Sequence, residues 1–220
     1  MVRYRKRFWI LAACLAGLAG YVDAVGFLKL GGFFVSFMSG NSTQLAVGIA
    51  INATAAETAG GLVASFLLGT IVGALVGATA GSRRKPAVLL LVAVLLYVAG
   101  AVDAESGGRA AAFVLAAAMG GENAVFQRDG EVSVALTYMT GTLVKLGQRI
   151  ASALIDGYTW TWAPHLILWC SLTGGAVVGA EAFLRVGFAA IWAAAVGATL
   201  LAGYAAAIGP EDREDESGEV

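Results

Sequence analysis

The sequence predicts an all-α integral membrane protein of about six transmembrane helices, arranged as two inverted repeats that each contain an interrupted, re-entrant segment. Three observations support this prediction. Hydrophobic residues make up 59% of the chain and charged residues only 13%, whereas a soluble domain carries roughly 25% charged residues. Six apolar stretches are long enough to cross a bilayer. The chain also repeats its own motifs at a nearly constant spacing.

The first expected span follows a basic N-terminus. Its apolar run extends from Phe8 to Leu28, about 21 residues, which at about 1.5 Å per residue is long enough to cross the hydrocarbon core. A signal peptide has the same order of charge and hydrophobicity but a shorter apolar region, so we interpret the run as a retained helix. The six expected spans are 8–28, 60–81, 87–104, 109–127, 163–183 and 187–208.

Two further apolar stretches, 30–51 and 131–154, are interrupted by small and polar residues. Non-helical backbone at membrane depth is tolerated only inside protein or beside a water-filled cavity. We therefore expect the first stretch to enter over 30–38, to break at 39–41 and to return as a helix over 42–51. Asn41 or Ser42 is expected to cap that returning helix. The second stretch is expected to break at Thr140-Gly141-Thr142.

Internal repeats indicate that the chain has two halves. Each motif of the first half returns about 100 residues later, in the same order: FMSGNSTQL (37–45) as YMTGTLVKL (138–146), GALVGATA (73–80) as GAVVGAEA (175–182), and VDAVGF (22–27), more weakly, as ENAVF (122–126). Glycine-rich helices resemble one another by chance, which would explain one match but not three in order. We assign residues 1–105 and 106–208 to two membrane repeats, and 209–220 to a disordered acidic tail.

The distribution of Lys and Arg favours inverted halves, because cytoplasmic loops carry an excess of these residues. If the interrupted segments re-enter, the basic residues divide 11 to 3 between the cytoplasmic and outer sides. If both segments cross instead, the halves are parallel and the split is 8 to 6. We therefore expect both termini in the cytoplasm. The 11 inner residues are Arg3, Arg5, Lys6, Arg7, Arg83, Arg84, Lys85, Arg128, Lys145, Arg149 and Arg213, and the three outer ones are Lys29, Arg109 and Arg185.

The two breaks define a candidate substrate site. Helices that start at the breaks would point their N-terminal amides at the bilayer centre, where these favour negative or electron-rich groups, and two such tips near the midplane form a recurring kind of transport site. Asp23 and Glu122 are ionisable residues inside expected spans, and such residues are usually functional. The candidate substrate-binding residues are Asp23, Ser39, Gly40, Asn41, Ser42, Thr43, Glu122, Asn123, Thr140, Gly141 and Thr142.

Two roles are open for Asp23. It is either a group that takes up and releases a proton during transport, or a structural acceptor of hydrogen bonds from the broken backbone around Ser39 to Thr43. Both Asp23 and Glu122 lie near the end of an expected helix, where a carboxylate also reaches the membrane interface.

The stretch GYVDAVGFLKLGGFFVSFMSGNSTQL resembles the N-terminal signature of the bacterial membrane family of unknown function that contains the YoaK proteins. In that family a Gly-x-x-Asp-Ala element precedes a Thr-Gly-Asn element. Gly20, Asp23 and Ala24 match the first, Gly40 and Asn41 match the second, and Ser39 replaces the threonine while keeping a hydroxyl. The resemblance implies a bacterial inner-membrane protein of about six helices and implies no established activity.

The function that we expect is that of a small transporter or channel-like permease for a small solute, with its site between the two breaks. The alternative is a structural or regulatory membrane protein that transports nothing. We expect no enzyme, because no nucleophilic triad is apparent, and no metal or cofactor, because metal-ligand spacing is absent. A net charge of −1 argues against nucleic acid as a partner. The expected partners are the lipid bilayer, the solute and a second copy packed through glycine-rich helix faces.

Overall fold

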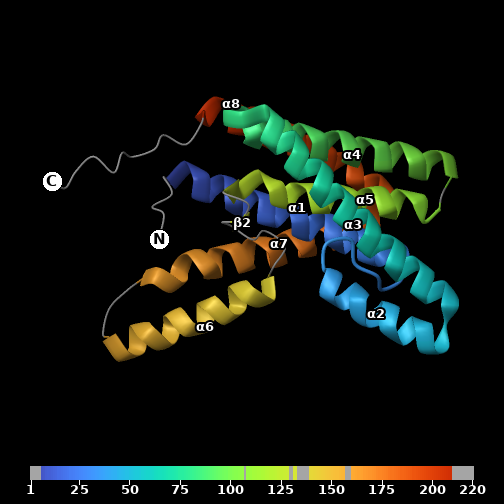
Figure 1. Ribbon diagram of the computed structural model, residues 1–220, viewed down its shortest axis with the longest axis horizontal. Helices are drawn as coiled ribbons and strands as arrows, with labels where there is room; N and C mark the ends of the chain where they lie inside the picture. Colours follow the sequence, from blue (N-terminus) through green and yellow to red (C-terminus); the bar gives the residue numbers. More distant parts are fainter. Residues whose placement is uncertain (1–5, 107, 129–130, 133–138, 157–159, 210–220) are drawn as a thin grey trace.

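The computed structural model describes residues 6–106, 108–128, 131–132, 139–156 and 160–209, and almost all of them are helical (Figure 1). The expected acidic tail from residue 210 onward lies outside the described residues, as does segment 133–138. The helices are α1 (Lys6–Leu30), α2 (Met38–Ile51), α3 (Ala53–Ala80), α4 (Arg84–Ser106), α5 (Ala110–Glu122), α6 (Met139–Asp156), α7 (Ala163–Val186) and α8 (Ile191–Ile208). Short elements join them: η1 (Gly81–Arg83), η2 (Asn123–Phe126), β1 (Gln127–Arg128), β2 (Glu131–Val132), η3 (Trp160–Trp162) and η4 (Gly187–Ala190).

Three helical stretches are long and apolar enough to cross a membrane, which confirms the prediction of an all-α membrane protein. They are Arg7–Leu30, Ala53–Ala104 and Trp160–Ile208, and Ala110–Phe126 is a shorter apolar helix. The second stretch contains α3 and α4 and the third contains α7 and α8. The six expected spans therefore correspond to α1, α3, α4, α5, α7 and α8.

Helix α3 begins earlier than the apolar pattern indicated. It starts at Ala53 rather than at residue 60, because the side chain of Asn52 accepts a hydrogen bond from the backbone N–H of Ala55 and caps the helix. The polar first turns of α3 therefore extend beyond the apolar stretch that marks the span.

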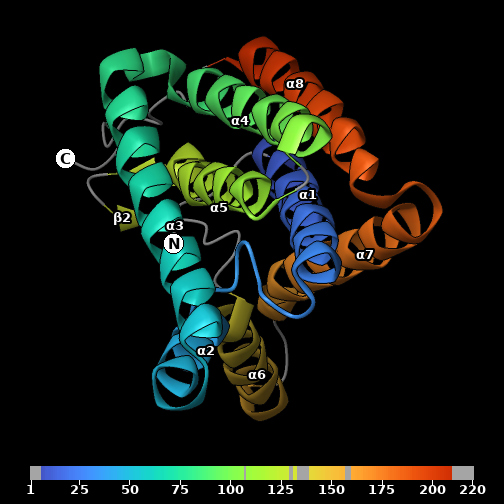
Figure 2. The ribbon, with the colours of Figure 1, turned by 90° about the vertical axis from the view of Figure 1, so that its right-hand side faces the viewer.

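The helices pack in a reciprocal pattern across the two halves. Helix α1 of the first half packs along α7 of the second, and α5 of the second half packs along α3 of the first. Likewise α4 packs on α5 and α8 packs on α1, while α4 and α8 pack on each other (Figure 2). Each half therefore completes its packing with helices of the other half.

The corresponding helices of the two halves run in opposite directions. Along the horizontal axis of Figure 1, α1 and α4 run left to right, and their counterparts α5 and α8 run right to left. Helix α3 runs right to left and its counterpart α7 runs left to right. The prediction of inverted halves requires this reversed direction.

Glycines allow both of the reciprocal helix pairs to approach closely. A Cβ added to Gly175 of α7 would collide with the carbonyl of Gly17 in α1, and a Cβ on Gly69 of α3 would collide with the carbonyl of Ala117 in α5. The expected glycine-rich faces are thus used inside the chain. They are not open to a second copy, so the expectation of a homo-oligomer through these faces is not supported.

The glycine contacts also define which residues correspond between the halves. Gly20 of α1 lies against the carbonyl of Leu172 in α7, and Gly120 of α5 lies in the same way against the carbonyl of Phe66 in α3. A second pair of contacts also corresponds: Gly179 of α7 lies against Tyr21 of α1, and Gly73 of α3 lies against Gly121 of α5. Residues of α1 and α5 therefore correspond at a spacing of 100, and residues of α3 and α7 at a spacing of 106. The sequence match of 73–80 with 175–182 is displaced from this register by one helical turn, because glycine recurs at every fourth position of these helices.

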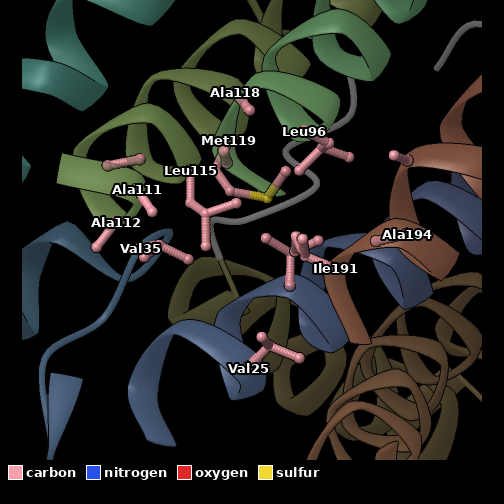
Figure 3. Packing of buried hydrophobic residues seen from close by; sticks show 14 of the residues in the cluster. Val25, Val35, Leu96, Ala111, Ala112, Leu115, Ala118, Met119, Ile191 and Ala194 are labelled. Atoms are coloured by element: carbon pink, nitrogen blue, oxygen red, sulfur yellow. The ribbon is translucent and has the colours of Figure 1, made fainter. Parts of the chain in front are cut away.

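The main hydrophobic core lies between α1, α4, α5 and α8 (Figure 3). Leu96, Leu115, Met119 and Ile191 are fully buried in it. Val35, from the segment between α1 and α2, is also fully buried and lies beside Ala111, Ala112 and Leu115 of α5. The core therefore holds the interrupted segment in place as well as the helices.

We predict that Gly175→Ala lowers the free energy of unfolding by about 1–3 kcal/mol, because the new methyl group meets the Gly17 backbone, which cannot rotate away. Thermal unfolding of the purified protein in detergent measures the change. Gly174→Ala is the matched control, since a Cβ on Gly174 meets nothing within 4 Å and helix propensity alone favours alanine by about 0.5–1 kcal/mol. Equal melting temperatures for the two variants would contradict the close approach of α1 and α7.

We further predict that Ser82 and Val186 lie on opposite sides of the membrane, as the excess of basic residues near Ser82 requires. Both residues are exposed. Val186 is the better position for a cysteine than its neighbour Gly187, whose φ of 63° disfavours a side chain. In intact cells, with Cys14 and Cys170 replaced, an impermeant thiol reagent should label Val186→Cys and leave Ser82→Cys unlabelled. Labelling of both from the same side would exclude inverted halves.

Candidate functional site

The two interrupted segments form short helices at the edge of the helix bundle. Helix α2 packs on α3, and α6 packs on α7. In Figure 1 both helices begin near the middle of the molecule and run outward toward opposite ends. In Figure 2 the two helices lie on the same, lower side of the bundle. The two polar segments that the sequence singled out therefore both begin near the middle of the molecule and on the same side of the bundle.

The break in the first half lies earlier than residues 39–41, where we expected it. Helix α1 continues to Leu30, residues 31–37 are non-helical, and α2 starts at Met38. Gly31 and Gly32 make the turn, with φ values of 67° and 120° that other residues rarely adopt. This glycine pair was the stronger turn signal in the sequence. Ser39, Gly40, Asn41, Ser42 and Thr43 consequently form the first turns of α2.

Asp23 holds the tip of the non-helical segment. Its Oδ1 atom accepts hydrogen bonds from the backbone N–H groups of Val35 at 2.9 Å and Ser36 at 2.7 Å. A carboxylate that accepts two amide hydrogen bonds forms strong, charge-assisted contacts. The structural role that the sequence left open for Asp23 is therefore observed, with Val35 and Ser36 as donors instead of the backbone around Ser39 to Thr43.

Asn41 and Gln44 hold the rest of the segment. The side-chain amide of Asn41 is fully buried; it accepts a hydrogen bond from the N–H of Phe34 and donates one to the carbonyl of the same residue. The Nε2 atom of Gln44 donates to the carbonyl of Gly32 at 2.7 Å. Three side chains thus pair with backbone groups that the helices leave unpaired, as a non-aqueous environment requires.

The expected capping role of Asn41 or Ser42 is wrong. Phe37 is the N-cap residue of α2, and it makes no side-chain cap hydrogen bond. Asn41 turns back to the preceding segment, and the Ser42 hydroxyl donates to the Met38 carbonyl. The reason is that the helix begins at Met38, which places Asn41 and Ser42 inside its first turns instead of at its end.

Hydroxyl groups at the start of α2 and α6 are exposed at the surface of the protein. Ser39, Ser42 and Thr43 are exposed on α2, and Thr140 is exposed on α6. The hydroxyl of Thr43 donates only within its own helix, to the Ser39 carbonyl. The described part of the protein therefore does not cover these side chains. Gly40 is half-buried, and a side chain at this position would meet the rings of Phe34 and Phe37.

The second half has polar residues at matching positions. Asn123 lies 100 residues after Asp23, in the spacing that the glycine contacts define, and Thr142 lies 101 residues after Asn41. Both are buried, and Asn123 donates to the Met119 carbonyl at 3.0 Å. Gly141 is half-buried in the first turn of α6. The expected break at 140–142 is wrong in the same way as the first, because α6 already starts at Met139.

Glu122 does not join this cluster. It ends α5, is fully buried, and has no hydrogen-bond partner for either carboxyl oxygen among the described residues. The part of the chain that the structure describes contains no group of three or more His, Cys, Asp or Glu residues that could hold a metal ion.

Three contacts at the ends of the spans were not anticipated from the sequence. Lys29 forms an ion pair with Asp103 at 2.6 Å, which joins the C-terminal ends of α1 and α4, and its ammonium group also lies 5.1 Å from the centre of the Phe188 ring. Arg109 donates to the hydroxyl of Thr58 at 2.9 Å and joins the start of α5 to α3. The sequence places Lys29 and Arg109 at span ends but contains no signal for their partners.

We predict that Asp23→Ala destabilises the protein by about 1–3 kcal/mol for each amide that loses its acceptor, and that Asp23→Asn, which keeps an acceptor oxygen, has a smaller effect. Thermal unfolding reports the loss, and faster hydrogen exchange of residues 31–37 locates it. Thr43→Ala is the control, because Thr43 bonds only within α2. Normal exchange of residues 31–37 in Asp23→Ala would contradict the holding role.

Comparisons with known proteins agree with the fold. The model of a family described as proteins of unknown function (DUF1275) matches residues 11–204. A UPF0700 transmembrane protein of Rhizobium meliloti (strain 1021) is 33% identical over 191 residues, which cover 87% of this chain and 83% of that protein. No solved structure matches the chain. The expected membrane family of unknown function is thereby confirmed, whereas the link to the YoaK proteins rests on the resemblance alone.

Proposed function

The chain belongs to the DUF1275 family of membrane proteins of unknown function, and we propose that it is a transporter or channel-like permease for a small solute. Its site lies where the first turns of α2 and α6 meet. The protein is built as two inverted repeats, and it resides in the bacterial inner membrane with both termini in the cytoplasm.

The observation that carries this proposal is the placement of exposed hydroxyl groups in the middle of the molecule. Ser39, Ser42 and Thr43 lie in the first turns of α2 and Thr140 in the first turn of α6. Both helices begin near the middle of the molecule and lie on the same side of the bundle (Figures 1 and 2). A face that contacts only lipid contains few such groups, whereas a solute path needs them. The N-terminal amides of the two helices add two positive dipole ends at the same place.

The rigid support around the site also favours this function. Asp23, Asn41 and Gln44 fix the segment before α2, and the buried Val35 anchors it in the core. A binding site built on irregular backbone needs such support, because the polar groups must keep their positions between binding events. The opposite directions of the two halves supply the symmetry that alternating access uses.

A non-transporting structural or regulatory role is the second candidate. The close glycine contacts between α1 and α7 and between α3 and α5 favour it, because they leave little room for a path through those helix pairs. In the transport proposal the path runs along α2 and α6, outside these pairs. The two candidates therefore differ in whether water reaches the start of α2.

We predict that Ser42→Cys and Thr140→Cys react with a charged, water-soluble thiol reagent in the membrane, after Cys14 and Cys170 are replaced. Leu68→Cys is the control, since Leu68 is 61% exposed on α3 but is surrounded by apolar residues. Reaction of the two polar positions with protection of Leu68→Cys indicates a wet path. If all three positions resist the reagent, the start of α2 is dry and the non-transporting role stands.

Thermal unfolding across a panel of small metabolites identifies the solute, because a ligand that binds the folded state raises its apparent stability by mass action. Solutes that shift the melting temperature are then tested for flux into proteoliposomes. Loss of both effects in Ser42→Cys after modification by the thiol reagent would assign the solute to this site.

A further inference from the structure

Glu122 is a buried carboxyl group that the proposed solute site does not use. It ends α5, its exposed fraction is 0%, and neither of its oxygen atoms has a hydrogen-bond partner among the described residues. Ala118 and Met119, one turn earlier on the same helix face, are fully buried and apolar. Burying an ionised carboxylate without hydrogen-bond partners costs much more free energy than burying a protonated one.

The packing does not require a carboxyl group at this position. Gly20 and Tyr21 of α1 make the same contacts as Gly120 and Gly121 of α5, so Glu122 corresponds to Val22 in the first half. Val22 is likewise fully buried. The same place in the fold is thus filled once by a hydrocarbon and once by an acid. Buried acids inside membrane spans that lack a structural role are usually functional.

The charged groups around Glu122 come from the helices packed against it, which are α3, α4 and α1. On α3 the described ionisable residue is Glu57, exposed at the far end of the helix. On α4, Arg84 and Lys85 lie at the near end, with Tyr97 and the paired Asp103 farther away. On α1, Arg7 and Cys14 lie toward the N-terminal end, and Tyr21, Asp23 and Lys29 lie toward the C-terminal end. Strand β2, which packs on η2, carries Glu131.

Lys85, at the N-terminal end of α4, lies close to the residues that follow Glu122 in the chain. Its ammonium group lies 4.3 Å from the centre of the Phe8 ring and 5.8 Å from the centre of the Phe126 ring. Phe126 follows Glu122 by four residues, in η2. Glu122 is therefore deep, yet only a few residues of chain separate it from the basic end of the bundle.

We propose that Glu122 is a reversible proton-binding site inside the membrane, reached from the end of the protein that carries Lys85. The ligand is a proton and not a metal ion, because Ca²⁺ and Mg²⁺ need about six or more oxygen ligands, and Ala118 and Met119, the nearest residues on its helix face, supply none. Coupling of this proton to solute movement rests on the proposed transport function, whereas proton binding itself does not.

The test is labelling of the purified, full-length protein with dicyclohexylcarbodiimide, a membrane-soluble reagent for carboxyl groups that carry their proton. The acid O–H adds across one C=N bond of the reagent, the proton goes to nitrogen, and the acyl group then shifts to nitrogen to give a stable N-acylurea. Peptide mass spectrometry locates the label. We expect it on Glu122, with the extent falling about tenfold for each pH unit above the titration midpoint.

Glu122→Gln removes the label and keeps the side-chain shape, and Glu122→Val tests whether the residue found in the first half is tolerated. Glu57→Gln is the matched control, because Glu57 is exposed and far from Glu122. It should leave the labelling of Glu122 unchanged. If Glu122→Gln does not fold, the labelled peptide of the unaltered protein still identifies the site.

Two results would overturn the proposal. Absence of label from Glu122 at every pH means that the group is not an accessible acid. Labelling that does not change with pH means that Glu122 stays neutral permanently and exchanges no proton. Because these measurements need no solute, they can succeed while the transport proposal fails, or fail while it succeeds.

Discussion

Backbone polar groups at membrane depth must find partners within the protein, and the rest of this structure depends on how that requirement is met. Residues 31–37 leave helical conformation between α1 and α2, and Asp23, Asn41 and Gln44 bond to the N–H and carbonyl groups that become free. Asp23, Asn41 and Gln44 are polar residues in an apolar sequence, and they supply hydrogen-bond partners to the non-helical backbone of residues 31–37. The same bonds fix where α2 begins, and therefore which hydroxyl groups reach the surface.

The tight interior and the polar edge have separate roles in this architecture. Glycine contacts bring α1 onto α7 and α3 onto α5, so closely that methyl groups would collide with backbone. This packing supplies a rigid frame without a hydrophobic driving force, which is weak between helices in lipid. Helices α2 and α6 lie outside these pairs, and Ser39, Ser42, Thr43 and Thr140 in their first turns are exposed. In the proposed function, rigidity and access are therefore located in different pairs of helices.

Much of this fold was predictable from the sequence because hydrophobic length and basic residues are properties of single segments. The apolar helices α1, α3, α4, α5, α7 and α8 were located this way, although α3 starts at Ala53 because of the cap by Asn52. The position of the break was missed, since Ser39 to Thr43 looked more polar than Gly31 and Gly32, and polarity was given more weight than backbone geometry. Side-chain partners such as Lys29 and Asp103 were out of reach, because they are 74 residues apart and depend on tertiary packing.

The exchange of helices between the halves has a consequence for how the protein is made. Helix α1 leaves the ribosome long before α7, its main neighbour, exists. During that interval the backbone of Gly17 and Gly20 faces lipid or another helix of the first half. A chain that ended after α4 would lack the partners of α1 and α3, so neither half is an independent folding unit. The contacts of α1 with α7 and of α3 with α5 therefore form only after the second half has been made.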